Sequence, residues 1–282
     1  MDSVNATILF ENTKPDSTGY IVDNGLSILV EKNGKQILYD TGKNDGLLKN
    51  AAALGVDLGI VDAVVISHGH NDHTGGLMGF LQVNNNAQIY LKRDALTPLF
   101  VKTPKIEKNI STNSRVLLKY SGRFTFVDTI TKIGEGIFIV PDIKRLYPIP
   151  SVNRILFSGK NGTIVNDKFE HELFMIIKEN NHLVIFTGCG HTGVQNIITT
   201  AKDVCLGTKI KAVIGGFHYE SPSIKGCQEP KENIEGAARW ILQEGIEKIY
   251  TGHCTGSSGY SIMKPILKDR IKRITTGMKI TI

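Results

Sequence analysis

The sequence predicts an α+β fold: two mixed β-sheets with helices on their outer faces. Each half of the 282-residue chain opens with short strand-like runs and then alternates strand-like with helix-like runs, which favours this class. Asn33-Gly34 separates two of the early runs and is typical of an antiparallel hairpin, because both central residues of a type I′ turn adopt positive φ. The apolar runs are far shorter than the roughly 20 residues that cross a bilayer, so no transmembrane helix is expected.

Apolar spacing predicts the elements of the first part of the chain. Leu47, Ala51 and Leu54 share one face of a helix. Residues 63–66 are apolar and mostly β-branched, which indicates a buried strand that ends just before a histidine-rich loop. In chain order the expected elements are strands at 8–11, 26–31 and 36–39, a helix at 45–54, a strand at 63–66, a helix at 77–81 and a strand at 88–91.

The second half shows a regular alternation. The expected elements are strands at 173–177 and 183–186, a helix at 194–204, a strand at 212–214, a helix at 234–244, a strand at 248–250, a helix at 259–268 and a strand at 274–282. Residues 94–161 contain five prolines among short apolar runs, and strands with substrate-facing loops are expected there. We expect one domain over residues 1–282, with 94–161 as the variable region that shapes the substrate pocket.

Charge and composition limit the partners and the location. The 33 Lys and Arg against 27 Asp and Glu give a net charge of +6, which favours a small anionic substrate. The basic residues are spread along the chain without interleaved aromatics, so neither nucleic acid nor a membrane is an expected partner. The four cysteines form no CxxC pair, so no disulfide framework is expected. The N-terminus lacks the pattern of a signal peptide, which predicts a cytoplasmic protein. The oligomeric state is left open.

The segment at residues 67–76 contains the main chemical signal. His68, His70, Asp72 and His73 place three imidazoles and a carboxylate within six positions after a strand. Imidazole and carboxylate groups are borderline to hard donors, which bind zinc, manganese or iron. If the loop curls, His68 and His70 point one way while Asp72 and His73 point another, which permits two adjacent metals. Glycines around them let the backbone turn tightly.

These four residues match in full the HxHxDH signature of the metallo-β-lactamase fold superfamily, which the chain resembles over nearly its whole length. The resemblance implies a four-layer αβ/βα sandwich and two divalent metal ions, with zinc preferred and manganese or iron as alternatives. Leu38-Tyr39-Asp40-Thr41-Gly42 resembles the family's first motif. The role implied for Asp40 is to orient a metal-binding histidine through a hydrogen bond.

The resemblance also implies ligands from the second half of the chain. His171 matches a ligand histidine, Cys189 a position where many members have a metal-bridging aspartate, and His253 the last ligand motif. This chain has Cys189 in place of that aspartate, and a thiolate at this position favours zinc. His191, two residues after Cys189, can replace His171 as the ligand or face the substrate, and the sequence leaves this choice open.

His218 and Tyr219 follow another expected strand and should open into the same cleft, because ligands gather at the carboxyl ends of such strands. His218 and His191 are candidates for substrate binding and proton transfer, and Tyr219 for substrate binding. The segments FTGCGHTGVQNII, GGFH and GHCTG resemble a narrower branch of dihydropterin-phosphate synthase-like proteins. That resemblance implies a pterin- or nucleotide-like substrate.

The expected function is a metal-dependent hydrolase, with Asp72 as both metal ligand and catalytic residue. Bound metal lowers the pKa of water from 15.7 to about 7, so hydroxide is available at neutral pH. The preferred substrate is a phosphoester or cyclic phosphate, and a carboxylic ester or lactone would use the same groups. An iron-dependent redox enzyme is an alternative; a ligand sensor without turnover and a nuclease are disfavoured by the complete HxHxDH loop and by the absence of a basic arm.

Overall fold

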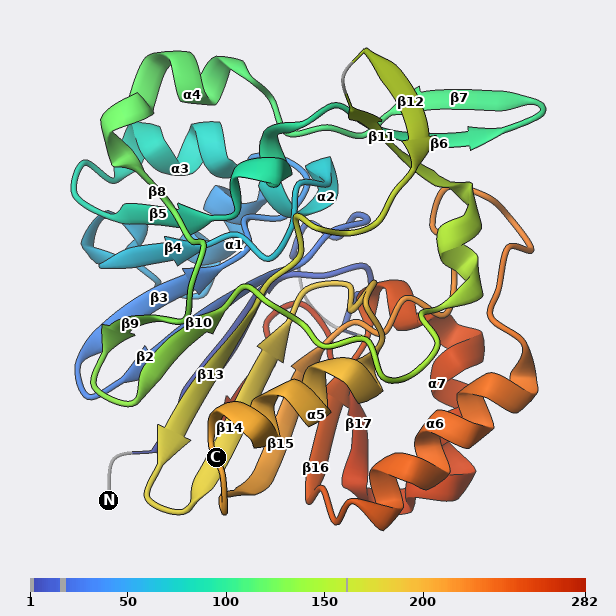
Figure 1. Ribbon diagram of the computed structural model, residues 1–282. Helices are drawn as coiled ribbons and strands as arrows, with labels where there is room; N and C mark the ends of the chain where they lie inside the picture. The colour runs from blue at the N-terminus through green and yellow to red at the C-terminus, as the bar shows by residue number, and fades with distance from the viewer. Residues whose placement is uncertain (1–2, 16–18, 161) are drawn as a thin grey trace. The chain divides into compact units, whose positions relative to one another are not determined.

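The structure is a computed structural model that describes residues 3–15, 19–160 and 162–282. The chain forms two compact units. Unit 1 contains Met1–Asp128, Leu156–His171 and Ile274–Ile282, and unit 2 contains Thr129–Ile155 and Glu172–Arg273. Within the described ranges, no helix combines the length and apolar character needed to traverse a lipid bilayer. Figure 1 labels the elements along the chain.

Unit 1 contains a seven-stranded mixed sheet. Its strands, in sheet order, are β18 (Lys279–Thr281), β1 (Asn5–Phe10), β2 (Ser27–Lys32), β3 (Lys35–Tyr39), β4 (Ala63–Val65), β5 (Gln88–Leu91) and β8 (Phe124–Phe126). The first four strands are antiparallel and the last four are parallel. Asn33 and Gly34 have φ of 50° and 74°, so the expected hairpin turn between β2 and β3 is confirmed.

The helices of unit 1 are α1 (Gly46–Ala53), α2 (Asn71–Thr74), α3 (Leu77–Val83) and α4 (Arg115–Tyr120). Side chains of α1, α3 and α4 pack against the sheet. Leu47 of α1 and Phe80 of α3 share a fully buried cluster with Leu38 and Val64 of the sheet. A separate four-stranded sheet contains, in order, β12 (Thr163–Asn166), β11 (Leu156–Lys160), β6 (Leu99–Thr103) and β7 (Ile106–Asn109).

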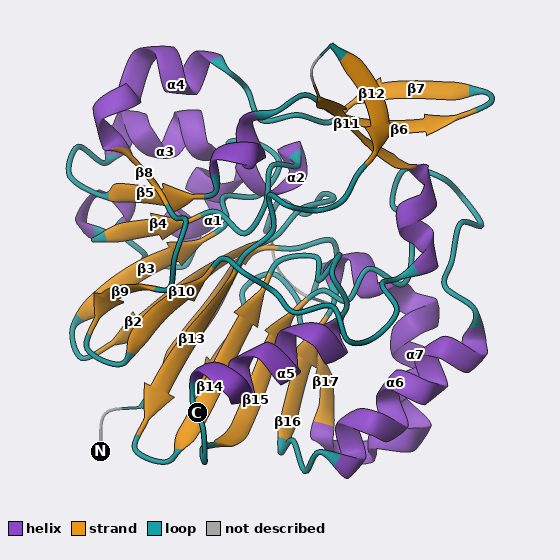
Figure 2. Cartoon of the chain, in the orientation of Figure 1, coloured by secondary structure: helices purple, strands orange, loops and turns teal. Residues whose placement is uncertain are grey.

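Unit 2 contains a second seven-stranded mixed sheet. Its strands, in sheet order, are β17 (Ile271–Arg273), β16 (Lys248–Thr251), β15 (Lys209–Gly215), β14 (His182–Thr187), β13 (Phe174–Glu179), β10 (Ile137–Val140) and β9 (Thr131–Gly134). The helices are α5 (Val194–Val204), α6 (Lys231–Gln243) and α7 (Gly256–Leu267). Figure 2 distinguishes these helices and strands by colour. Strands β14 to β17 are parallel, so their carboxyl ends meet at one edge of the sheet.

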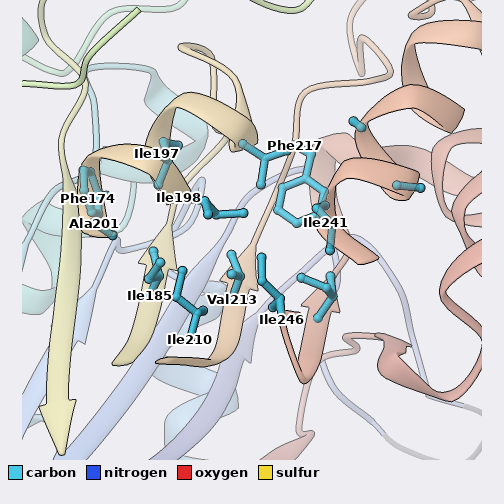
Figure 3. Packing of buried hydrophobic residues seen from close by; sticks show 14 of the residues in the cluster. Phe174, Ile185, Ile197, Ile198, Ala201, Ile210, Val213, Phe217, Ile241 and Ile246 are labelled. Carbon is cyan, nitrogen blue, oxygen red and sulfur yellow. The ribbon is translucent and has the colours of Figure 1, made fainter. Parts of the chain in front are cut away.

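Apolar side chains of these helices cover one face of the second sheet. Ile197 and Ile198 of α5 and Ile241 of α6 pack with Ile185 and Val213 of the sheet in one buried cluster, which Figure 3 shows from close by. A fully buried aliphatic side chain contributes about 1.5–3 kcal/mol to folding. The cluster therefore holds α5 against the parallel strands and fixes the loops that precede and follow it.

The α+β class expected from the sequence is confirmed, but three local expectations differ from the structure. The strand expected at 274–282 is shorter in the structure: β18 covers Lys279–Thr281, and the residues before it include a turn at Gly277, with φ of 88°. The region 94–161 contains the helix α4, which the strand-and-loop expectation missed because its apolar run is short. The histidine-rich loop includes one helical turn, α2.

Candidate metal centre

The histidine loop of unit 1 brings its four donor side chains together in two pairs. Nε2 of His68 lies 3.0 Å from Nδ1 of His70, and Nε2 of His73 lies 3.9 Å from Oδ2 of Asp72. The loop follows β4 and contacts neighbouring backbone closely. A Cβ atom at Gly69 would lie 2.2 Å from the carbonyl oxygen of Ala95, so only glycine fits there.

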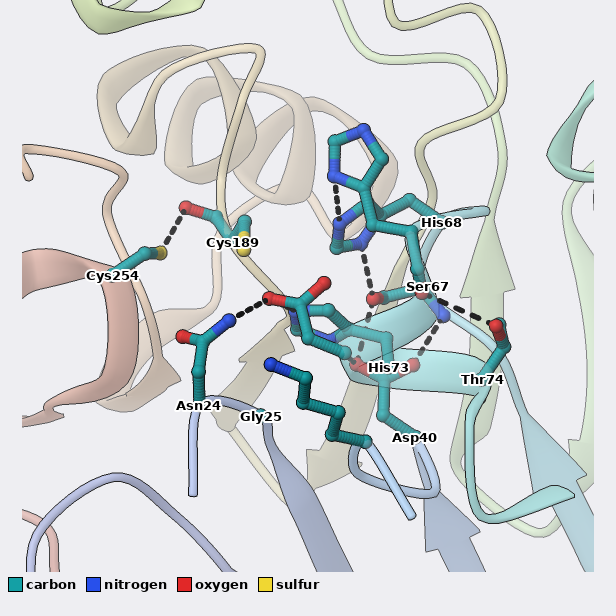
Figure 4. A network of polar contacts seen from close by, with 12 residues as sticks. Asn24, Gly25, Asp40, Ser67, His68, His73, Thr74, Cys189 and Cys254 are labelled. Carbon is teal, nitrogen blue, oxygen red and sulfur yellow. Dashed lines mark hydrogen bonds and ion pairs between the residues drawn. The ribbon is translucent and has the colours of Figure 1, made fainter. Parts of the chain in front are cut away.

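Asp40, directly after β3, orients this loop. Its Oδ2 accepts a hydrogen bond from Nδ1 of His73 at 2.7 Å, and its two oxygens accept the backbone N–H and the hydroxyl of Ser67 at 2.7 Å (Figure 4). This arrangement assigns the His73 proton to Nδ1 and its lone pair to Nε2, the atom that faces Asp72. Asp40 has a φ of 58°, a left-handed conformation that aspartate tolerates better than most residues.

Asp72 is itself held in place from the loop before β2. Nδ2 of Asn24 donates a hydrogen bond to Oδ2 of Asp72 at 3.0 Å, and Figure 4 shows this contact as a dashed line. The backbone N–H of Leu26 donates to the carbonyl oxygen of Asp72 at 3.2 Å. The segment at 24–26 therefore fixes both the side chain and the backbone of this carboxylate.

The donors of the loop fit a divalent transition metal. Burial and the neighbouring His171 lower the pKa of His70 to about 3, so its ring is neutral at physiological pH, as metal ligation requires. Imidazole nitrogens and a carboxylate are the donor types of zinc, manganese and iron sites. The hydrogen bond from His73 to a carboxylate is the usual support of a metal-binding histidine. That the two donor pairs bind two separate metals stays a prediction.

His171 lies beside the loop in unit 1, and both of its ring nitrogens have protein partners. Nδ1 accepts the backbone N–H of Gly69 at 3.2 Å, and Nε2 donates to Oδ2 of Asp167 at 2.9 Å. Burial acts to raise the pKa of Asp167, but the hydrogen bond and charge of His171 outweigh it, so the pKa lies below its ordinary value. His171 would bind a metal by giving up one of these hydrogen bonds, and its role as a ligand stays a prediction.

His191 of unit 2 is positioned by two buried polar residues. Its Nδ1 lies 3.0 Å from Oδ1 of Asn153, which places the ring proton on Nδ1 and the lone pair on Nε2. The two oxygens of Glu172 accept the backbone N–H groups of His191 and Thr192 at 2.7 Å each. This support suits either role left open by the sequence, metal ligand or substrate contact.

Cys189, His218 and Cys254 meet at the carboxyl ends of the parallel strands in unit 2. Their donor atoms all lie within 4.8 Å of one another, and all three residues are buried. Burial acts to raise the pKa of the Cys254 thiol, but the hydrogen bond with Cys189 and the adjacent His253 and His218 outweigh it, so the pKa lies well below its ordinary value. The His191 and His218 rings are 4.1 Å apart.

Tyr219 lines a cavity of about 430 Å³ in unit 2, with Pro148, Trp240 and Arg239 also in its wall. The cavity falls in the range of small-molecule sites. Tyr219 is almost fully buried, and burial together with the charge of Glu229 raises the pKa of its hydroxyl. Its expected contact with substrate stays a prediction, and the wall of this cavity includes none of Cys189, His191, His218 and His253.

Each unit thus gathers a part of the residues expected from the sequence. Unit 1 brings together Asp40, His68, His70, Asp72, His73 and His171, and unit 2 brings together Cys189, His191, His218, Tyr219 and His253. Contacts with six other residues were not predicted from the sequence: Asn24, Ser67, Asn153, Asp167, Glu172 and Cys254. The four-residue spacing of Asp167 and His171 is a sequence signal that could have indicated their contact. Nothing in the sequence indicates the roles of Asn153 and Asn24.

The chain is similar to known proteins of one fold. The model of the metallo-beta-lactamase superfamily matches residues 20–157. A crystal structure of Tm1679, described as a metal-dependent hydrolase of the β-lactamase superfamily, superposes with a TM-score of 0.84 at 29% identity and covers 99% of both chains. Zinc-bound PqqB from Methylobacterium extorquens has the same fold, with a TM-score of 0.61 at 12% identity over 98% of this chain and 99% of that one. The chain has the metallo-β-lactamase fold, and the resemblance expected from the sequence is confirmed.

Among curated proteins, the chain is similar to a synthase of Methanocaldococcus jannaschii. This relative is the 7,8-dihydropterin-6-methyl-4-(β-D-ribofuranosyl)-aminobenzene-5′-phosphate synthase, 28% identical over 291 aligned positions that cover 98% of this chain and 96% of the relative. A second relative from the same organism is uncharacterised and 26% identical over 86% of this chain and 88% of its own length. The expected likeness to the synthase branch is therefore confirmed.

Proposed function

We propose that the protein is a metal-dependent hydrolase that cleaves a phosphoester or cyclic phosphate of a small pterin- or nucleotide-like molecule. The observation that carries this proposal is the pairing of donor atoms in the histidine loop, His68 with His70 and Asp72 with His73, supported by Asp40. These four residues would hold the metal. Zinc is the preferred ion, with manganese or iron as alternatives. A second ion, with Cys189 and His253 as ligands, follows from the family resemblance alone.

A bound divalent metal supplies an acidified water, whose pKa falls from 15.7 to about 7. The chain's own residues provide orientation and proton transfer. Asn24 fixes the carboxylate of Asp72, and Asp40 fixes the ring of His73, so neither side chain needs to reorganise during the reaction. His191 and His218 are the candidates to donate a proton to the leaving group or to stabilise its charge.

Three observations support a hydrolase that acts on a small phosphorylated molecule. The cavity beside Tyr219 has the volume of a small-molecule site. The Methanocaldococcus relative is named for a product that carries a 5′-phosphate. Tm1679, at 29% identity over nearly the whole chain, is described as a hydrolase. A cytoplasmic location is part of this proposal.

A second candidate function is a synthase reaction on a phosphorylated pterin. It is favoured by the curated relative, which covers 98% of this chain and is named as a synthase rather than a hydrolase. The two candidate reactions differ in the number of substrates and in the product that they form. A hydrolase releases an alcohol or phosphate from a single substrate, whereas a synthase needs two substrates and forms a larger product.

The test is a substrate screen with metal analysis. Protein purified without added metal would be assayed for metal content and for turnover of phosphomonoesters, phosphodiesters, cyclic phosphates and lactones, beside His68→Ala and Asp72→Ala. The half-exposed His182 offers a matched control as His182→Ala. We expect cleavage of a phosphoester that is lost on chelation, restored by zinc or manganese, and absent from the two loop variants.

Other outcomes would favour the alternatives. Turnover restricted to lactones would indicate a carbon electrophile at the same site. Stoichiometric redox-active iron with oxygen consumption would replace hydrolysis with redox chemistry. Equal turnover in native protein and both loop variants would show that the activity does not depend on the histidine loop, which contradicts the proposal.

A further inference from the structure

Three buried donors in unit 2 come from the ends of three neighbouring parallel strands. Cys189 follows β14, His218 follows β15 and Cys254 follows β16. Because these strands are parallel and adjacent, the residues just beyond them meet at one edge of the sheet. A thiol, an imidazole nitrogen and a second thiol thereby lie within 4.8 Å of one another, with each residue at most 5% exposed.

The backbone around Cys254 holds its sulfur in this cluster. Sγ of Cys254 accepts the backbone N–H of His218 at 3.3 Å and donates to the carbonyl oxygen of Cys189 at 3.5 Å; Figure 4 draws the second contact. A Cβ atom at Gly216 would lie 2.6 Å from this sulfur, so the glycine leaves room for it. The sulfur therefore lies between the backbones of the other two donors.

His218 is held in an unusual state for a residue with only a structural role. Its φ is 50°, a left-handed conformation that costs a histidine free energy relative to an ordinary one. Both of its ring nitrogens are buried and have no hydrogen-bond partner among the described residues. A buried polar group without a partner is destabilising. A ligand that accepts the lone pair of one ring nitrogen would reduce this cost.

The donor set selects the chemistry of that ligand. Two thiolates and one imidazole are soft to borderline donors, which favour zinc over magnesium or calcium. Three protein ligands leave the fourth tetrahedral position open to water or another small ligand, as in catalytic rather than structural zinc sites. Coordination would also explain why the fold keeps two thiols and an imidazole together in a buried place.

We propose that Cys189, His218 and Cys254 form a zinc site of their own, which binds metal without the donors of the histidine loop. The site uses Cys189, which the family resemblance assigns to a second catalytic metal, together with two residues to which it assigns no metal. It goes beyond the proposed hydrolase function, because it requires metal binding by unit 2 residues whether or not the histidine loop is intact.

The experiment uses the full chain with the histidine loop disabled. In a His68→Ala/His70→Ala/Asp72→Ala background, reduced and metal-free protein would be titrated with Co²⁺, and bound Co²⁺ would then be displaced by Zn²⁺. We expect one equivalent of cobalt with an intense thiolate-to-cobalt charge-transfer band. Cys254→Ser and His218→Ala in the same background should weaken binding by more than about 100-fold, beyond what changes outside the ligand shell usually cost.

Matched controls separate loss of a ligand from loss of the fold. Cys205 is also buried but lies at the end of α5, so Cys205→Ser should keep the band. Circular dichroism and the unfolding midpoint of each variant, with Cys254→Ala beside Cys254→Ser, identify variants that fail to fold. For His218, the more conservative His218→Gln should fold and still bind cobalt more than about 100-fold more weakly than the parent.

Three results would overturn the proposal. The loop-disabled protein could bind no cobalt after full reduction, its spectrum could lack a sulfur band, or folded Cys254→Ser could bind as tightly as the parent. None of these depends on turnover. A native protein that shows no metal-dependent hydrolysis, while its loop-disabled variant still binds cobalt through sulfur, would refute only the hydrolase proposal.

Discussion

Oδ2 of Asp40 accepts a 2.7 Å hydrogen bond from Nδ1 of His73, and both side chains are fully buried. This contact joins the end of β3 to the short helix α2, which lie more than thirty residues apart in sequence. It fixes the tautomer of His73, so that the nitrogen facing Asp72 carries the lone pair. The same carboxylate accepts two hydrogen bonds from Ser67 and so also holds the start of the histidine loop.

Asp40→Asn should weaken metal binding without unfolding the protein. The amide keeps the shape of the carboxylate but has one acceptor oxygen, so it cannot accept both the His73 N–H, which bonds Oδ2, and the Ser67 backbone N–H, which bonds Oδ1. With the amide NH2 group toward His73, the ring loses its fixed tautomer. We expect metal affinity to fall by about 10–100-fold, measured by competition with a chromophoric chelator. Asp62→Asn is the control, because Asp62 is exposed and accepts the backbone N–H of Gln36. Unchanged affinity in Asp40→Asn would rule out this orienting role.

Asn24→Ala tests the support of Asp72. The variant removes the 3.0 Å hydrogen bond to Oδ2 of Asp72 and leaves the carboxylate free to rotate. We expect metal affinity to fall about 10-fold and kcat to fall by a comparable factor. Turnover would be measured both at saturating metal and without added metal. The exposed Asn85 provides a control as Asn85→Ala. A change in stability alone, with metal binding intact, would make Asn24 a structural residue only.

Stability of the metal-free protein should fall as the pH drops below neutrality. The pKa of His70 is about 3 in the folded state and 6.5 for the unperturbed residue. The unfolded chain therefore takes up a proton first as pH falls, which favours unfolding. Each pH unit below 6.5 lowers the free energy of unfolding by about 1.4 kcal/mol. At pH 5, which is 1.5 units below that pKa, the loss is therefore about 2 kcal/mol.

His70→Gln isolates this effect, because glutamine does not titrate. Urea unfolding of the metal-free variant at pH 7 and pH 5 should show a drop smaller by about 2 kcal/mol than in the native chain. His182→Gln changes a half-buried histidine and should keep the native pH dependence. If His70→Gln loses as much stability between pH 7 and pH 5 as the native protein, other groups cause the decline.

Glu172→Gln should destabilise unit 2. Each oxygen of Glu172 accepts one backbone N–H, from His191 and Thr192, and an amide can accept only one of these bonds. Leaving a buried N–H without a partner costs about 1–3 kcal/mol, measured as a shift in the free energy of unfolding by urea. Glu247→Gln, at an exposed position, should stay within about 0.5 kcal/mol of native. Equal stabilities of the two variants would contradict the anchoring role of Glu172.

The sequence predicted most elements near the site because their signals are local. The Asn33-Gly34 turn follows from the positive φ that only such residues adopt readily, and the helix expected at 194–204 coincides with α5. The strand expected at 274–282 is longer than the observed β18 (Lys279–Thr281) because the alternating pattern of the sequence continues through the turn at Gly277. The periodicity of apolar residues indicates which face of a segment is buried. It does not reveal a turn at which the chain passes from one sheet to another.

The sequence by itself determined that His68, His70, Asp72 and His73 would lie close together, since four donors within six positions after one strand have few ways to separate. It could not determine which atoms hold them, because hydrogen-bond partners such as Asn24 and Asp167 come from distant segments. Only the tertiary structure decided that Cys254 would join Cys189 and His218. Parallel pairing of three strands brings together residues whose separation along the chain gives no sign of their contact.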